Sequence, residues 1–414
     1  MRVVETIAAP EGIGPGWQLT IFVAALFAIF TRLPGAFLHP QFFAEDGWVW
    51  YGQAYNLHWL RSLGIAQAGC LYIFPRLVAG ISLLFPMQWA PLIMNFAGAV
   101  IQALPVSALL SSRCSPWGPL RVRMLMAALY IAVPDAPEIH VVLTNAVWHL
   151  ALLQALLAFS LPPLSWRGRV SDILLFGIGG LTGPFCILLL PAVVAYWWFR
   201  RQRWTLVVLA LMFAGALIQA LNILQTVRSP GAPLGPTPLR LLRIIAGSIF
   251  IDSMVGTGGP NLRVLFLFAA AIGGLFILVW GWRSAPLAVR LYTAFAIIVL
   301  MAVLRDPLLL PSNTPRWEML ANAMGIRYWF LPSLMFLWCA VWCASAGRSR
   351  LVRFAGLAVL LLTMVGLVRK WIYPPWPNSQ FSAEVEHFKS LKSGEHMTFS
   401  VYDPGGRTME LIKR

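Results

Sequence analysis

Residues 17–38 read WQLTIFVAALFAIFTRLPGAFL, a run that carries one charge, Arg32. A helix needs about 20 consecutive apolar residues to cross the hydrocarbon core of a bilayer. Similar runs recur through the 414 residues, of which 59% are hydrophobic and 11% charged, whereas a soluble domain carries about 25% charged residues. Because only helices and closed barrels satisfy all backbone groups in lipid, we expect an all-α polytopic membrane protein.

Short basic loops orient the expected helices. Five segments are rich in arginine and nearly free of acid, at 113–123, 166–169, 200–203, 283–290 and 348–353. Positive loops stay in the cytoplasm, so an even number of crossings must separate any two of them. Eleven helices satisfy this rule, at 17–38, 88–111, 120–134, 143–162, 172–183, 185–199, 204–225, 263–282, 287–304, 327–346 and 352–368. We therefore expect a multi-pass protein of a bacterial inner membrane, with a cytoplasmic N-terminus and a periplasmic C-terminus.

The first external loop is expected to hold two helices that lie along the membrane surface. Residues 46–60 place aromatic side chains on one helical stripe and Gln53 and Asn56 off it, a pattern typical of the headgroup level. Residues 72–85 are apolar, but they are short and interrupted by Pro75 and Arg76. Counting 72–85 as a span would also place the basic loop 113–123 outside.

The last residues differ in kind from the rest of the chain. The end, TFSVYDPGGRTMELIKR, has two alternating runs around Asp403-Pro404-Gly405-Gly406, which predicts a β-hairpin. We therefore expect a transmembrane domain at 1–370 and a small external α/β appendage at 371–414.

The formal net charge of +16 could suggest nucleic-acid binding, but its distribution argues against that class. The positive charge is largely arginine in short loops between apolar runs, where it orients helices and attracts anionic lipids. Membrane lipids are therefore expected partners, and nucleic acid is not.

Unusual polar residues gather on the expected external side. The stretch QFFAEDGWVW at 41–50 places Glu45 and Asp46 side by side among aromatic residues. Charged side chains near a bilayer are energetically costly and are therefore rare there unless they have a function. Further along the chain, the same side receives Arg76, Asp135, Glu138, His140, Asn145, His149, Arg305, Asp306, Arg316, Glu318, Arg327 and Tyr328.

This combination suits transfer of a sugar from a lipid phosphate. A partly desolvated carboxylate has a raised pKa and can accept a hydroxyl proton as a general base. Arginines bind phosphate bidentately and stabilise the charge that develops on the leaving group. The sequence thus favours a glycosyl transfer at the outer face.

Each residue also has a structural explanation. Asp46 could cap the helix that it precedes, and Arg76 could anchor its helix at the interface. His140 and His149 are more often hydrogen-bonded packing residues than catalysts. Arg305 and Asp306 could form a local ion pair of little consequence.

The pattern resembles the GT-C superfamily of integral membrane glycosyltransferases. The features that carry the resemblance are a first helix, an external loop with an acidic residue near its start, and two juxtamembrane helices. Several stretches also look like a group of poorly characterised bacterial membrane proteins: FFAEDGWVWYGQAY, LYIFPRLVAG, LTNAVWHLALL, GGLTGPFCILLLP and GIRYWFLP. The resemblance implies a polyprenyl-phosphate-linked sugar donor and a cell-envelope glycan or lipid as acceptor.

Residue by residue, the resemblance implies Asp46 as the catalytic carboxylate, with Glu45 as second choice. Arg76 would contact the donor phosphate, together with Arg327 and Arg305. The substrate would be lined by Tyr72, Asp135, Glu138, His140, Asn145, His149 and Tyr328. A divalent metal stays open: the sequence requires none, and Asp135 and Glu138 are the candidate acidic pair.

Two other functions remain open. A transporter or flippase for a lipid-linked or anionic substrate would show repeated halves and broken helices at mid-membrane, whereas the charges here lie at helix ends. A glycan polymerase or ligase would use a large external loop with a catalytic arginine or histidine, and 226–262 carries Arg228, Arg240 and Arg243.

Overall fold

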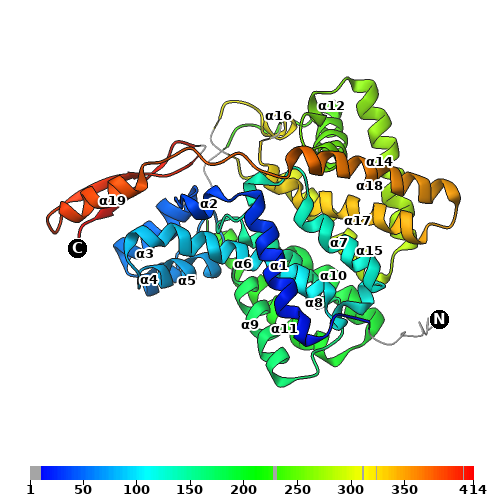
Figure 1. Ribbon diagram of the computed structural model, residues 1–414, viewed down its shortest axis with the longest axis horizontal. Coiled ribbons are helices and arrows are strands. Elements are labelled where there is room, and N and C mark those ends of the chain that lie inside the picture. The colour runs from blue at the N-terminus through cyan, green and yellow to red at the C-terminus, as the bar shows by residue number, and fades with distance from the viewer. Residues whose placement is uncertain (1–10, 227–230, 310–311, 323, 404) are drawn as a thin grey trace.

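The computed structural model describes residues 11–226, 231–309, 312–322, 324–403 and 405–414. Within these ranges the chain is mostly helical, and its one sheet has two strands. Figure 1 shows the helices packed into one body, with the C-terminal residues beside the short helices of the first loop. Arg228, in the expected external loop 226–262, and Pro404, in the expected hairpin turn, lie outside the described residues.

In the described part of the chain, six helices are long and apolar enough to cross a membrane. By length and composition this agrees with a polytopic helical membrane protein. The six are α6 Ala90–Leu110, extended by the 3₁₀ turn η2 Met87–Trp89; α11 Arg203–Gln225; α14 Val264–Ser284; α15 Leu287–Arg305; α17 Phe330–Ala346, preceded by η7 Ile326–Trp329; and α18 Arg350–Lys370.

The other five expected spans correspond to shorter helices. These are α1 Pro15–Arg32, α7 Leu120–Ala132, α8 Ala146–Ala158, α9 Trp166–Gly180 and α10 Phe185–Arg200. α7 and α8 have 13 residues each, about 20 Å at the α-helical rise, against a hydrocarbon core of about 30 Å. The structure therefore supports the helical membrane class, and the number eleven stays a prediction.

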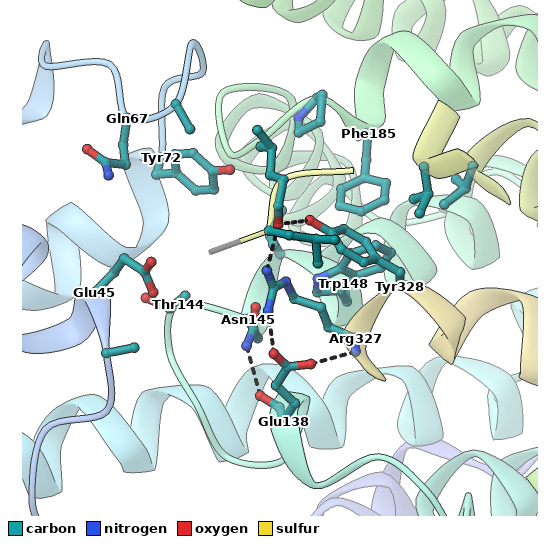
Figure 2. A pocket seen from close by; sticks show the side chains of 18 of the residues that line it. Glu45, Gln67, Tyr72, Glu138, Thr144, Asn145, Trp148, Phe185, Arg327 and Tyr328 are labelled. Atoms are coloured by element: carbon teal, nitrogen blue, oxygen red, sulfur yellow. Dashed lines mark hydrogen bonds and ion pairs between the residues drawn. The ribbon is translucent and has the colours of Figure 1, made fainter. Parts of the chain in front are cut away.

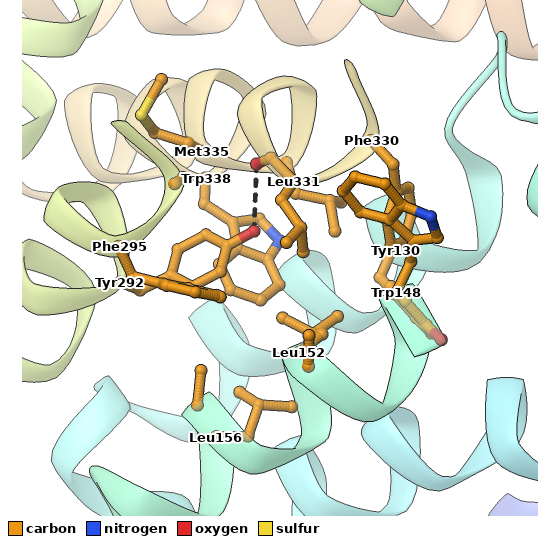
Figure 3. Packing of buried hydrophobic residues seen from close by; sticks show 14 of the residues in the cluster. Tyr130, Trp148, Leu152, Leu156, Tyr292, Phe295, Phe330, Leu331, Met335 and Trp338 are labelled. Carbon is orange, nitrogen blue, oxygen red and sulfur yellow. Dashed lines mark hydrogen bonds between the residues drawn. The ribbon is translucent and has the colours of Figure 1, made fainter. Parts of the chain in front are cut away.

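The core of the bundle surrounds α17. Trp338 packs edge-on against Trp117, with 5.9 Å between ring centroids, and packs in a tilted arrangement against Tyr292, with 4.8 Å between centroids. The polar atoms of these rings are satisfied, since Trp338 Nε1 donates to Met126 O at 3.1 Å and Tyr292 Oη donates to Leu331 O at 3.1 Å. Figure 3 shows this aromatic layer beside the leucines of α8.

The first loop folds differently from the expected single helix over 46–60. The segment begins as a π-helical turn, η1 Asp46–Tyr51, continues as α3 Gly52–Leu57, and resumes as α4 Trp59–Leu63 after His58, whose φ is 75°. The left-handed backbone at His58 ends the helix. The second expected surface helix is α5 Ile73–Ser82, and a single turn, α2 Gly35–Leu38, follows α1.

A second irregular region lies between the long helices α11 and α14. It contains α12 Pro238–Leu242, the π-helix η5 Arg243–Ile251, α13 Asp252–Val255 and the 3₁₀ turn η6 Gly259–Asn261. The short helix α16 Arg316–Ala321 packs against α12. Two further 3₁₀ turns are η3 Ser112–Trp117 and η4 Pro137–Ile139.

The C-terminal residues form α19 Phe381–Ser390 and the antiparallel strands β1 His396–Ser400 and β2 Thr408–Ile412. They share a hydrophobic core with the first loop. Phe42, Trp50 and Tyr51 belong to the same buried cluster as Phe381 and Phe399. This shared core fixes the hairpin against the first loop, and it thereby positions both segments at one cavity.

Candidate functional site

Glu45 and Asp46 point in different directions, although they are neighbours. Asp46 is 1% exposed: its Oδ1 accepts a hydrogen bond from Thr144 N at 2.7 Å, and its Oδ2 accepts one from Leu143 N at 3.3 Å. Successive helical residues project about 100° apart, so Glu45 faces away from these amides. Figure 2 shows the Glu45 carboxylate opposite Arg327, at the edge of a cavity.

Burial shifts the pKa of Asp46 above its ordinary value. Desolvation raises the pKa of Asp46 to about 7, the hydrogen bonds from Thr144 and Leu143 oppose the rise, and the charge of Glu45 adds to it. Trp50 Nε1 donates to Thr144 Oγ1 at 2.6 Å and forms a second link between the first loop and Thr144. Asp46 thus anchors the chain at 143–144, where the cavity wall begins.

The cavity has a volume of about 470 Å³ and lies where the first loop, α8, α10, α15, η7 and the C-terminal hairpin meet. Its lining is polar and aromatic on one side and aliphatic between α10 and α15. The lining residues are Phe43, Ala44, Glu45, Trp50, Gln67, Ala68, Tyr72, Glu138, Thr144, Asn145, Val147, Trp148, Pro184, Phe185, Leu188, Val299, Ala302, Val303, Asp306, Leu308, Leu309, Arg327, Tyr328, Asp403 and Arg407.

Glu138 and Arg327 form one wall of the cavity. The Arg327 guanidinium pairs with Glu138 Oε1, and Arg327 N donates to Glu138 Oε2 at 2.8 Å. Asn145 Nδ2 donates to Glu138 O at 2.8 Å, and Tyr328 Oη donates to Leu308 O at 2.5 Å (Figure 2). Arg327 Nη2 also donates to Leu308 O, at 3.1 Å. Glu138, Asn145, Arg327 and Tyr328, which come from separate segments of the chain, therefore form one connected group.

The C-terminal hairpin contributes Asp403 and Arg407, which sequence reasoning missed. Arg407 Nε and Nη2 donate to the two oxygens of Asp403 at 2.7 and 2.9 Å, and Nη2 lies 3.5 Å from Glu45 Oε1. The guanidinium also lies 4.5 Å from the ring centroid of Trp48. Ala44 N donates to Tyr402 O at 2.9 Å and holds the two segments together. No local pattern in the sequence indicates that the C-terminal hairpin packs against the first loop.

The two candidate histidines lie in the core and do not line the cavity. His140 hydrogen-bonds Gln102 Nε2 and Ile29 O, each at 2.9 Å, and His149 hydrogen-bonds Tyr130 Oη at 2.8 Å and Ile139 O at 3.1 Å. Burial, and then the charge of Arg32, holds the pKa of His140 below its ordinary value. The structure thus gives both rings a packing role.

Arg76, Asp135 and Arg305 also lie outside the cavity lining. Arg76 is fully buried behind Trp50, with its guanidinium 4.9 Å from that ring and Nη1 donating to Gln53 Oε1 at 2.9 Å. Burial lowers its pKa to about 10. Burial, with the charge of Asp252, raises the pKa of Asp135 to about 8. Arg305 is exposed at the end of α15.

Tyr72 lines the cavity beside Trp50, with 5.3 Å between their ring centroids, and burial raises its pKa. For a metal, no group of three or more His, Cys, Asp or Glu side chains that could hold an ion is found among the described residues. The side chains that line the cavity present carboxylates, guanidinium groups and aromatic faces.

Comparison with known protein families, with curated proteins and with solved structures finds no match to this chain.

Proposed function

We propose that the chain is a membrane glycosyltransferase that moves a sugar from a polyprenyl-phosphate donor to a glycan or lipid acceptor of the cell envelope. One observation carries the proposal: a cavity-facing carboxylate, Glu45, lies 3.5 Å from a guanidinium group, Arg407, in a cavity walled by Trp50, Tyr72 and Trp148. Aromatic faces and amide side chains such as Asn145 suit a sugar ring. The aliphatic side between α10 and α15 suits the first isoprenoid units of the donor.

In the proposed reaction, Glu45 takes the proton of the acceptor hydroxyl as general base. The acceptor oxygen forms a bond to the anomeric carbon, and the bond from that carbon to the donor phosphate oxygen breaks. The lipid phosphate leaves with the electron pair, and Arg407, with Arg327, stabilises its charge. Asp46 then acts as a positioning residue, because its carboxyl holds the amides of Leu143 and Thr144.

The proposed topology keeps eleven crossings, a cytoplasmic N-terminus and a periplasmic C-terminus in a bacterial inner membrane. In this arrangement the cavity, the first loop and the hairpin all face the periplasm. Each of the five helices shorter than a full span would then cross the membrane together with the loop residues at its ends, which pack inside the protein. In the loop between α7 and α8, for example, Val133, Ile139 and Val142 are buried. Irregular backbone at membrane depth is tolerated where protein surrounds it.

The test uses envelope glycans from a strain that lacks the chain, complemented with wild type, Glu45→Gln or a control. Removing a general base lowers a rate by about 10²–10⁴-fold, so Glu45→Gln should give glycans that lack the transferred sugar in mass spectra. The matched control is Glu386→Gln, which removes one carboxylate from an exposed ion pair of α19 and should give wild-type glycans.

Wild-type glycans from Glu45→Gln, at wild-type protein level, would overturn the proposal. A transporter is distinguished by a separate readout: loss of the glycan with accumulation of the lipid-linked sugar on the cytoplasmic face.

A further inference from the structure

A second cavity, of about 330 Å³, lies between α12 and α16 and shares no lining residue with the first. It is lined by Thr237, Leu239, Arg240, Arg243, Glu318, Ala321 and Asn322. Two arginines and one glutamate give this small space a formal charge of +1. None of the steps proposed for the glycosyl transfer uses it.

One of the two arginines forms hydrogen bonds and an ion pair within the protein. Arg240 Nη1 donates to Gly235 O at 2.7 Å, and Nη2 pairs with Glu318 Oε2 at 2.5 Å. The hydroxyl of Thr237 accepts from Arg240 N at 3.2 Å and caps α12. Arg240 and Glu318 therefore neutralise each other and build the wall of the cavity.

Arg243 carries the remaining charge. Its side chain has no hydrogen bond or ion pair with any residue that the structure describes, and its buried Nε lacks a partner. A buried donor left without an acceptor destabilises the folded protein, and an anion that accepted from it would remove this penalty. Arg243 is also the first residue of the π-helix η5, and π-helical segments occur frequently at functional sites. The N–H groups of an unpaired guanidinium at a cavity can donate hydrogen bonds to a bound anion.

The surroundings of the cavity are apolar and exposed. Leu239, which lines the cavity, is 40% exposed, and the adjoining start of α14 exposes Leu265 and Phe266 at 77% and 58%. α14 is one of the six helices apolar enough to cross a membrane. An anion that reaches Arg243 from this side therefore arrives next to lipid-facing surface.

We propose that this cavity binds a phosphate group, and that the phosphate belongs to the headgroup of an anionic lipid whose chains lie against α14. Two N–H groups of Arg243 donate to the phosphate oxygens as a fork, and the exposed amide of Asn322 donates a further hydrogen bond. Arg240 keeps the cavity open through its pair with Glu318. This site is independent of the proposed transfer reaction, because it shares none of the residues of that reaction.

The experiment uses the full chain, delipidated in neutral detergent, and three probes: dioctanoyl-phosphatidylglycerol, dioctanoylglycerol and inorganic phosphate. Binding is followed by native mass spectrometry and by the rise in Tm. The wild type should prefer the phosphatidylglycerol over both other probes. Arg243→Gln should weaken that binding about tenfold or more, the equivalent of about 1.4 kcal/mol. Without lipid, Arg243→Gln should not lower Tm, because it removes an unpaired charge.

Two further variants make the test specific. Arg263→Gln removes an exposed arginine at the start of α14 and should bind the lipid as the wild type does. Arg243→Lys keeps the charge but loses the fork, so its affinity should fall between those of the wild type and Arg243→Gln. Equal affinity of wild type and Arg243→Gln, or an equal loss in Arg263→Gln, overturns the site. Equal binding of dioctanoylglycerol or of inorganic phosphate overturns the lipid phosphate as its ligand.

Discussion

Arg407 Nη2 lies 3.5 Å from Glu45 Oε1, although 362 residues of chain separate the two side chains. The first loop supplies the carboxylate and the C-terminal hairpin supplies the guanidinium. In the proposed reaction, a phosphate that bound Arg407 Nη2 would compete with Glu45 for its N–H groups. Donor binding would therefore release Glu45 from its ion pair, at the moment when the proposed reaction needs a free base.

The first prediction concerns Arg407. Arg407→Gln should lower sugar transfer by about 10–100-fold, because a charge-assisted contact to phosphate is worth about 1.5–3 kcal/mol. Arg407→Lys should retain part of the activity, since it keeps the charge without the fork. Glycan mass spectrometry measures the loss. The control is Lys392→Gln, which removes an exposed charge before β1; full transfer by Arg407→Gln would exclude the phosphate contact.

The second prediction is a pH dependence of stability due to Asp46. Its folded pKa is about 7, above the value of about 3.9 in an unfolded chain. Between these values the folded state holds a proton that the unfolded state releases, so stability falls as pH rises from about 4 to 7. The contribution is at most about 4 kcal/mol. Asp46→Asn does not titrate and should remove this fall.

The measurement compares Tm at pH 5 and pH 7.5 in detergent. The difference should be smaller for Asp46→Asn than for the wild type. Glu386→Gln, on the exposed face of α19, should keep the wild-type difference. An unchanged difference in Asp46→Asn would mean that Asp46 is ionised in the folded protein at pH 5.

The pair Glu45 and Asp46 shows how far sequence reasoning reaches. The charges among aromatic residues indicated a site in the first loop, and the loop does line a cavity. The sequence could not decide which carboxylate faces it. That depends on Ala44, whose φ of 42° turns the chain, and on the backbone N–H groups of Leu143 and Thr144, which donate to the carboxylate of Asp46.

Long-range contacts were out of reach for the same reason. Alternation predicted two strands around residue 404, but hydrophobic patterns do not specify where a hairpin packs. Arg407 and Asp403 reach the cavity because Tyr402 pairs with Phe43 and because Phe399 enters the core of the first loop. The histidines were ambiguous too: their roles depend on acceptors such as Ile29 O and Ile139 O, which come from other elements.

The third prediction concerns the close approach of α6 to the loop that Asp46 holds. A Cβ at Gly98 would lie 2.3 Å from Val141 O, which is backbone and cannot swing away. Gly98→Ala should therefore destabilise the protein by about 1–3 kcal/mol, seen as a lower Tm. Gly273→Ala in α14, where a Cβ meets nothing within 4 Å, should keep or raise Tm because alanine favours the helix. Equal Tm values for the two variants would contradict the packing.

The fourth prediction concerns the ion pair in the cavity wall. Each oxygen of Glu138 has its own donor from Arg327, one from the guanidinium and one from the backbone. The two side chains are 23% and 27% exposed, so solvent screens their attraction only in part. A double-mutant cycle with Glu138→Gln and Arg327→Gln, measured by unfolding in detergent, should give a coupling energy of about 1–2 kcal/mol.

The matched cycle uses Glu386 and Lys389, an exposed pair one helical turn apart on α19 with side chains 71% and 49% exposed. Screening and side-chain entropy should reduce that coupling to about 0.3–0.5 kcal/mol. The backbone donor of Arg327 survives both substitutions, so the cycle isolates the charge pair from the hydrogen bond to the main chain. If the cavity pair couples no more strongly than the exposed pair, Glu138 positions the chain at Arg327 through the backbone alone.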